Sequence, residues 1–189
     1  MNMKTKIAIF TVLFALATAF TLPQSGGRYM TKNGKVSFFS HTPVEDIKGD
    51  NNKVSSVLDS KSGKIVIELL VKSFAFKKAL MEEHFNENYM ESTKFPKSKF
   101  DGKIDNISAI NFSKDGTYTS GVSGNLTIKD KSNAIKTTGT FTVKGGKLNG
   151  KAVFKINPTD YNIVIPAVVK DKIAKDIEIT ADLDYEPMK

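Results

Sequence analysis

The sequence contains no cysteine and no tryptophan, and it has only two histidines and one arginine among its 189 residues. Without cysteine, the chain can form no disulfide, no thiolate metal site, no thiol nucleophile and no cysteine-linked lipid anchor. A domain of this length does not need disulfides, because about two-thirds of its unfolded surface can be buried on folding. These absences exclude several classes of enzyme and metalloprotein, and they leave a chain that depends on a packed core.

The charged residues are mostly lysines spread along the chain, which carries a formal net charge of +8. Domains that bind nucleic acid usually cluster Lys and Arg with interleaved aromatic residues. The lysines show no such clustering in the sequence, so we expect no nucleic-acid partner. A dispersed positive charge leaves room for a transient contact with an anionic membrane surface.

The first nineteen residues have the pattern of a secretory signal sequence. A basic start is followed by an almost wholly apolar run over residues 7–16 and by small residues up to Ala19. The run is shorter than the about 20 residues that a transmembrane helix needs, which favours a cleaved signal over a membrane anchor. We therefore expect cleavage near Ala19, a flexible lead over residues 20–33, and a single domain over residues 34–189 that is periplasmic or secreted.

Most of the remaining chain alternates apolar and polar residues with a period of two, which is typical of strands with one buried face. The clearest alternating segments are residues 65–71, 100–105, 122–129, 135–143, 152–156 and 177–184. Turn residues such as Lys144-Gly145-Gly146 and the stretch 130–133 lie between them. About eight half-polar strands in hairpin order must close on themselves or pair as two sheets, and closure is the more economical arrangement. The sequence thus predicts a mainly β, antiparallel up-and-down barrel.

Three glycines, Gly102, Gly124 and Gly139, fall at positions that face the interior of the predicted barrel. A glycine there either lets a strand bend at a barrel corner or leaves room for a ligand. The pattern favours neither interpretation over the other.

One segment departs from the β pattern. Met81 and the aromatic residues four and eight positions later form an apolar stripe, with glutamates between them. This stripe predicts one main α-helix near residues 74–91, ended by Pro96 and packed against the barrel. A second short helical stretch is predicted near residues 167–175.

Four segments carry a resemblance to a known family. They read FFSHTPV from Phe38, MEEHFNENYMESTKFPKSKFDGKI from Met81, GNLTIKDKSNAIK from Gly124 and DYNIVIPAVVKDKIAKDIEITADLD from Asp160. In this order and spacing, they resemble the YceI family over about residues 34–184. The resemblance implies an exported, lipocalin-like β-barrel with a helix over it, which encloses a polyisoprenoid or a fatty-acid-like lipid. The turn that follows Ile128 lacks the glycine that many relatives have there.

For such a ligand, we expect the binding residues to be inward-facing apolar side chains of the strands and of the helix. The predicted lining residues are Phe38, Ile65, Ile67, Leu69, Ile104, Leu126, Ile128, Phe141, Phe154 and Ile156 from the strands, and Leu80, Met81 and Phe85 from the helix. An eight-stranded barrel has an interior just wide enough to be filled by side chains or to hold one small apolar ligand. The function expected is therefore that of a binding protein for an amphiphilic lipid, without catalytic residues or a cofactor.

Two alternatives stay open. The first is a metal or acid/base site that uses His41 and His84. A zinc site ordinarily has three or four ligands at recognisable spacings, and no such spacing occurs around these two histidines. The second is a structural or stress-related envelope protein whose barrel is filled by its own side chains. The volume of the interior separates the second alternative from a lipid carrier.

Overall fold

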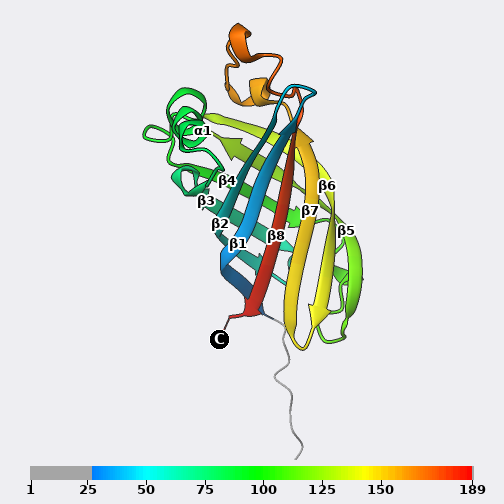
Figure 1. Cartoon of the computed structure of the whole chain (residues 1–189). Coiled ribbons are helices and arrows are strands. Elements are labelled where there is room, and N and C mark those ends of the chain that lie inside the picture. Colours follow the sequence, from blue (N-terminus) through cyan, green and yellow to red (C-terminus); the bar gives the residue numbers. More distant parts are fainter. Residues whose placement is uncertain (1–26, 189) are drawn as a thin grey trace, which may run out of the picture.

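The computed structural model describes residues 27–188, which form a closed barrel of eight antiparallel strands in sequence order (Figure 1). The strands are β1 (Arg28–His41), β2 (Asp46–Asp59), β3 (Lys64–Leu70), β4 (Lys97–Ile104), β5 (Gly116–Ile128), β6 (Lys131–Lys144), β7 (Lys147–Ile156) and β8 (Ile177–Pro187). Each strand pairs with the next, and β1 closes the ring against β8. The predicted up-and-down barrel is confirmed.

The first strand begins earlier than the sequence predicts. Residues 28–33 were expected in a flexible lead, but they form the start of β1, where Tyr29 pairs with Leu58 of β2 and with Pro187 of β8. This segment has no run of alternating apolar residues, so its strand character depends on partners far away in the sequence. The predicted signal sequence, residues 1–19, lies outside the described residues.

Two hairpin turns contain residues with positive φ angles, and different residue types adopt this conformation in each turn. Between β6 and β7, Gly145 and Gly146 have positive φ angles of 56° and 78°, as a tight two-residue turn requires. Between β5 and β6, the turn is made by Lys129 and Asp130, and Lys129 has a φ of 54°. Most of the predicted turn at 130–133 therefore belongs to β6, and a lysine takes the left-handed conformation that usually favours glycine.

The helix is shorter than predicted and changes from an α-helix to a π-helix along its length. Helix α1 (Ala79–His84) continues directly into a π-helical turn, η2 (Phe85–Tyr89), beside one end of the barrel (Figure 1). Residues 74–78 are extended instead, since Ala75 bridges to Asp50 of β2. The helix ends before Glu91, whose φ is 48°, rather than at Pro96.

The remaining helical pieces are single 3-10 turns. They are η1 (Val71–Ser73), η3 (Ile107–Ala109), η4 (Pro158–Tyr161) and η5 (Ala167–Val169). The second helical stretch predicted over residues 167–175 is thus reduced to η5. Within residues 27–188, no helix is both long enough and apolar enough to cross a membrane.

The barrel interior is divided along its axis. At the end away from α1, the strands bring together fully buried side chains that are at most 2% exposed: Tyr29, Leu58, Ile104, Leu148 and Tyr185. We call this region the closed half. The loop between β4 and β5 seals it, because Ile110 is buried there and the ring of Phe112 packs against Tyr29, tilted by 31° with ring centroids 5.4 Å apart. The end beside α1 is the open half.

Candidate functional site

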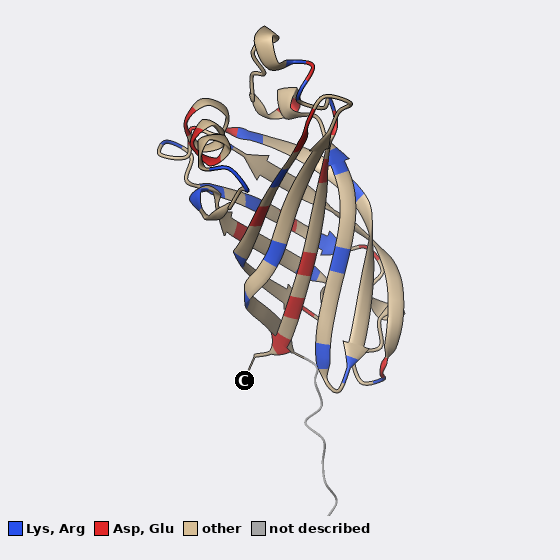
Figure 2. Cartoon of the chain, in the orientation of Figure 1, with Lys and Arg blue, Asp and Glu red and all other residues tan. Residues whose placement is uncertain are grey.

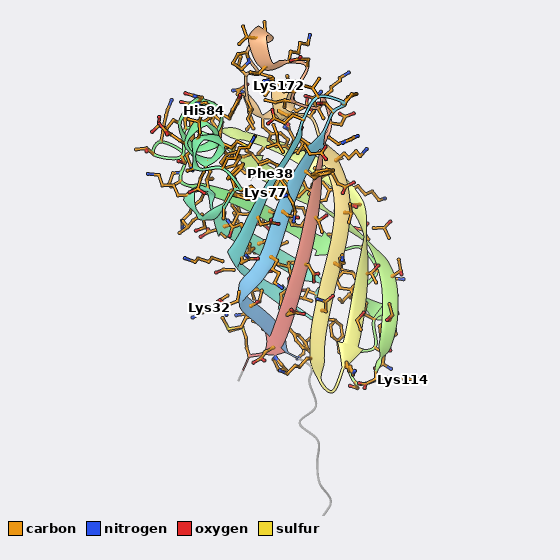
Figure 3. The ribbon with its side chains drawn as sticks, viewed as in Figure 1. Lys32, Phe38, Lys77, His84, Lys114 and Lys172 are labelled. Carbon is orange, nitrogen blue, oxygen red and sulfur yellow. The ribbon has the colours of Figure 1, made fainter. Side chains whose placement is uncertain are left out.

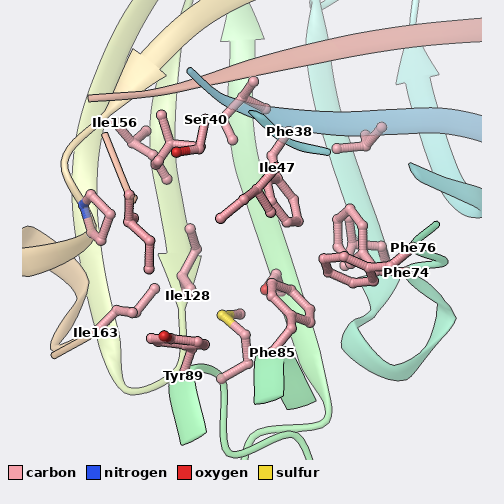
Figure 4. Close-up of a pocket in the computed structure, with 18 of the residues that line it drawn as sticks. Phe38, Ser40, Ile47, Phe74, Phe76, Phe85, Tyr89, Ile128, Ile156 and Ile163 are labelled. Atoms are coloured by element: carbon pink, nitrogen blue, oxygen red, sulfur yellow. The ribbon is translucent and has the colours of Figure 1, made fainter. Parts of the chain in front are cut away.

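The open half contains a cavity of about 540 Å³, which is within the range of about 300–1,000 Å³ typical of small-molecule pockets (Figure 4). Its wall consists of inward-facing side chains from the strands, from α1 and η2, and from the segment between β7 and β8. Many of these apolar side chains, such as Ile67, Leu126 and Phe154, are only half-buried although they point inward. They retain this exposure because they face the cavity instead of each other.

Four phenylalanine rings form one side of the cavity and hold the helix in place (Figure 4). Phe38 of β1 stacks on Phe85 of η2 with ring centroids 5.3 Å apart, and Phe76 lies 5.0 Å from Phe85. Phe74 completes the cluster, 5.5 Å from Phe38. Aromatic pairs at these distances add to the stabilisation from buried area, so η2 is fixed against the barrel by the same rings that line the cavity.

Aliphatic side chains dominate the other side of the cavity. Ile128 of β5, Ile156 of β7 and Ile163 lie there together with Tyr89 of η2 (Figure 4). Ile163 belongs to the segment 157–176, which projects beyond the strand ends in Figure 1. One backbone contact ties this segment to β1, because the N–H of Ala174 donates to Ser40 Oγ at 2.9 Å.

Lys129 links the structures around the mouth. Its side chain is only 6% exposed, and its Nζ donates to the carbonyl oxygens of Tyr89 at 3.3 Å and of Asn162 at 3.2 Å. The same amine forms an ion pair with Glu91, and this hydrogen bond holds the pKa of the Glu91 carboxyl below its ordinary value. A single turn residue thus joins β5, the end of η2 and the segment after η4. These bonds also account for a lysine at a positive φ.

Charged groups gather at the mouth of the cavity. Lys78 Nζ lies 3.8 Å from Glu45 Oε1, and His84 and Lys172 are exposed at the rim (Figure 3). Acidic and basic residues are both present around this end (Figure 2). The arrangement suits a molecule with its apolar part inside and its polar part at the rim.

Ten of the thirteen predicted lining residues border the cavity. They are Phe38, Ile67, Leu69, Leu80, Met81, Phe85, Leu126, Ile128, Phe154 and Ile156. The other three, Ile65, Ile104 and Phe141, are at most 5% exposed and pack in the core of the closed half. They point inward as predicted, but period two gives only the face of a strand, whereas the position along the barrel axis decides whether a residue meets the cavity.

Sequence reasoning missed the lining residues that lie outside the regular strands and the helix. Phe74 and Phe76 precede α1, and Ile163, Ile165 and Ile173 lie between β7 and β8. The alternation in Phe74-Ala-Phe76 and in Ile163-Val-Ile165 was an available signal, because it places apolar side chains on one side of an extended chain.

The inward-facing glycines provide space for neighbouring aromatic rings rather than for a ligand. A Cβ atom at Gly102 would lie 2.5 Å from Phe100 Cζ, and one at Gly124 would lie 2.8 Å from the same atom. A Cβ at Gly139 would lie 2.9 Å from the ring of Phe141. At Gly102 and Gly124 an added Cβ would also meet backbone atoms of the neighbouring strand, so a larger residue there would require the strands themselves to shift.

The two histidines occupy different settings. His41 is exposed, and its Nδ1 lies 2.6 Å from Asp46 Oδ1 across the β1–β2 hairpin. His84 ends α1 at the cavity rim. Within residues 27–188, no three His, Cys, Asp or Glu side chains come together as a metal-binding group. His41 is not part of the cavity wall.

A closed eight-stranded barrel with an apolar cavity beneath a short helix defines a lipocalin-like class of protein. Residues 29–185 match the YceI-like domain, and the chain belongs to the YceI family. No curated protein matches the sequence.

Solved structures share the fold. A polyisoprenoid binding domain from Saccharophagus degradans, implicated in plant cell wall breakdown, has a TM-score of 0.75 and 12% identity, with 86% of this chain and 99% of that chain covered. BcnA from Burkholderia cenocepacia has a TM-score of 0.66 and 19% identity, covering 80% and 95%. The YceI protein of Campylobacter jejuni has a TM-score of 0.60 and 18% identity, covering 79% and 90%. At these identities the likeness establishes the fold.

Proposed function

We propose that the protein is an exported binding protein that encloses the tail of an amphiphilic lipid, of the polyisoprenoid or fatty-acid type. The observation that carries this proposal is the cavity of about 540 Å³, whose wall consists mainly of Phe, Ile, Leu, Val and Met side chains. The polyisoprenoid binding domain from Saccharophagus degradans, which has the same fold, supports it.

The energetics of such a complex would come from the tail. Burial of each methylene group contributes about 0.8 kcal/mol, so a tail of ten or so buried carbons binds tightly without a charged anchor. The polar head would stay at the rim, near Lys78, His84 and Lys172. We therefore expect affinity to depend mainly on the tail and only weakly on the head group.

The alternatives fit the cavity less well. A barrel filled throughout by its own side chains would leave no space of this size, and only the closed half is filled in that way. A metal or acid/base site on His41 and His84 predicts bound metal, or an activity that disappears when either histidine becomes alanine. Stoichiometric zinc, copper or iron in the purified protein would favour that site over lipid binding.

Export is the second part of the proposal. We expect residues 1–19 to be removed near Ala19 and the mature protein to be periplasmic or secreted. N-terminal sequencing of the protein isolated from its own host tests this expectation. Full-length chains recovered from the cytoplasm alone would contradict it.

The third part is a transient contact with a membrane, from which a lipid would enter the cavity. Four apolar side chains near the mouth are more than half exposed: Val44, Leu80, Val164 and Val168. Because acidic and basic residues are mixed around them, insertion of apolar side chains would contribute more than lipid charge (Figure 2). Equal flotation with neutral and anionic vesicles, reduced by Val168→Ser, is the expected result. No flotation with either vesicle would contradict this part.

A matched pair of substitutions tests lipid binding. Phe154 lines the cavity and Phe141 packs in the closed half, and both are inward-facing phenylalanines. Phe154→Trp places extra bulk in the cavity, so it should reduce uptake of farnesol or palmitate, measured by native mass spectrometry of delipidated protein, at little cost in stability. Phe141→Trp overpacks a filled core, and it should lower stability by about 1–3 kcal/mol while uptake is preserved. Absence of uptake by the parent protein would overturn the proposed function.

A further inference from the structure

The cavity has a defined floor within the barrel. On β3, Leu69 and Ile67 line the cavity, but Ile65 does not; on β6, Ile135 and Thr137 line it, but Phe141 does not. The same boundary recurs around the ring of strands, since the lining stops at Ile179 on β8 and at Val36 on β1. A tail that enters from the mouth therefore meets a wall of packed side chains at the middle of the barrel.

Phe100 is central to this floor. It is 7% exposed, it lines the cavity, and it also belongs to the buried cluster that contains Ile65 and Ile104. Its ring lies over Gly102 and Gly124, as shown by the 2.5 Å and 2.8 Å that would separate Phe100 Cζ from added Cβ atoms there. The ring thus occupies the space that the two glycines leave.

The volume above this floor limits the length of a tail. A methylene group takes up about as much room as a water molecule does in the liquid, about 30 Å³, so a cavity of about 540 Å³ holds on the order of 18 carbon atoms. We propose that the barrel measures chain length: it encloses three to four isoprene units, or a fatty chain of similar carbon number, and Phe100 sets the limit. This inference rests on the proposed function.

The enclosed length predicts how affinity depends on the ligand. Each additional buried methylene strengthens binding by about fourfold, so an added isoprene unit of five carbons should lower Kd by more than about tenfold until the cavity is full. Further units would remain in water at the mouth and add little. Affinity should therefore rise steeply and then level off after three or four units.

A series of prenyl alcohols with two, three, four, six and eight isoprene units tests the limit. Each alcohol displaces a fluorescent fatty acid from the delipidated, full mature protein, and Kd is plotted against chain length. The expected curve levels off at three to four units. A parent protein that binds no member of the series overturns the proposed function together with this inference. A Kd that keeps falling up to eight units overturns the length limit alone.

Substitutions at the floor should move the limit in opposite directions. Phe100→Ala removes the ring and should shift the plateau to chains about one isoprene unit longer, because the space left by a deleted side chain only partly collapses. Phe141→Ala deletes the same ring from the closed half and should leave the plateau unchanged. Leu126 pairs with Phe100 across β4 and β5 and also lines the cavity.

Leu126→Trp adds bulk at this level and should shift the plateau to chains about one unit shorter, with a loss of at least about tenfold in affinity for the four-unit alcohol. This variant adds atoms to empty space, so it tests the inference even if Phe100→Ala does not fold. A plateau that Leu126→Trp leaves unchanged would overturn the role of this floor.

Discussion

The two halves of the barrel are made by the same strands with the same inward and outward alternation, yet one half is filled and the other is hollow. On β3, Ile65 and Ile67 lie on the same face, two positions apart. Ile65 pairs with Gly102 and is buried in the closed half, whereas Ile67 pairs with Phe100 and lines the cavity. The difference between hollow and filled therefore does not lie in the strand pattern.

The loops at the two ends account for the difference. At the closed end, the β4–β5 loop inserts Ile110 and Phe112 against Tyr29. At the open end, the segments around α1 and between β7 and β8 lie over the mouth and leave Leu80 and Val168 exposed, at 59% and 86%. The β4–β5 loop fills one end with packed side chains, whereas the segments at the other end place side chains such as Phe85 and Ile163 in the wall of the cavity and leave its interior open.

The largest expected effect comes from matched truncations in the two halves. Ile65→Ala removes atoms from a packed core and should lower the free energy of unfolding by about 2–5 kcal/mol. Ile67→Ala removes atoms that already face a cavity and should cost clearly less in delipidated protein. Urea denaturation of both variants measures the difference. Equal losses would show that the open half is as tightly packed as the closed half.

The next effect concerns how the open half is held together. Lys129→Met removes the buried amine that binds Tyr89 and Asn162, and the two unpaired carbonyl oxygens should cost about 1–3 kcal/mol. Hydrogen exchange should increase in η2 and after η4 but not in the closed half. Lys131→Met, an exposed lysine beside the same turn, is the control and should change neither. Unchanged exchange in Lys129→Met would show that the rim is held by other contacts.

The Lys129 contact also predicts a pH dependence. Since the pKa of Glu91 is lowered in the folded state, its stabilising contribution is fully present above the ordinary value of 4.5 and is lost as the pH falls through the lowered pKa. In Lys129→Met, this loss of folding stability with falling pH should disappear. Stability curves of the two proteins between neutral and acidic pH measure it, and identical slopes would contradict the assignment.

A smaller effect is expected from a buried hydrogen bond in the closed half. Tyr185 OH lies 2.7 Å from Ser56 Oγ, and burial raises the pKa of Tyr185. Tyr185→Phe should cost about 0.5–1.5 kcal/mol near neutral pH. Above about pH 10 the unfolded state loses the phenolic proton and the folded state keeps it, so stability should fall by about 1.4 kcal/mol per pH unit through this group. The substitution should remove that slope, whereas Tyr118→Phe, which loses an exposed hydrogen bond, should retain it.

The sequence predicts the features of this fold that depend on neighbouring residues, and it does not predict those that depend on contacts between distant segments. Alternation predicts the strands and their inward faces, and the stripe of Met81, Phe85 and Tyr89 predicts a helix whose three residues all line the cavity. Position along the axis depends on pairing between distant strands, so the alternation alone predicts Ile65, Ile104 and Phe141 as cavity lining although they pack in the core. The bonds of Lys129 join three segments that meet only in the folded chain, so no local sequence pattern predicts them.

The smallest effect is expected from substitution of His41, and it tests whether this histidine takes part in ligand binding or catalysis. The pair of His41 Nδ1 and Asp46 Oδ1 is exposed, with side chains 69% and 60% accessible, and such surface pairs contribute about 0–1 kcal/mol. His41→Ala should therefore loosen mainly the β1–β2 hairpin near Pro43 and leave lipid uptake within severalfold of the parent. Thermal melting and native mass spectrometry measure both quantities. Complete loss of uptake with an intact fold would mean that the hairpin contacts the ligand, and that the binding site extends beyond the cavity wall.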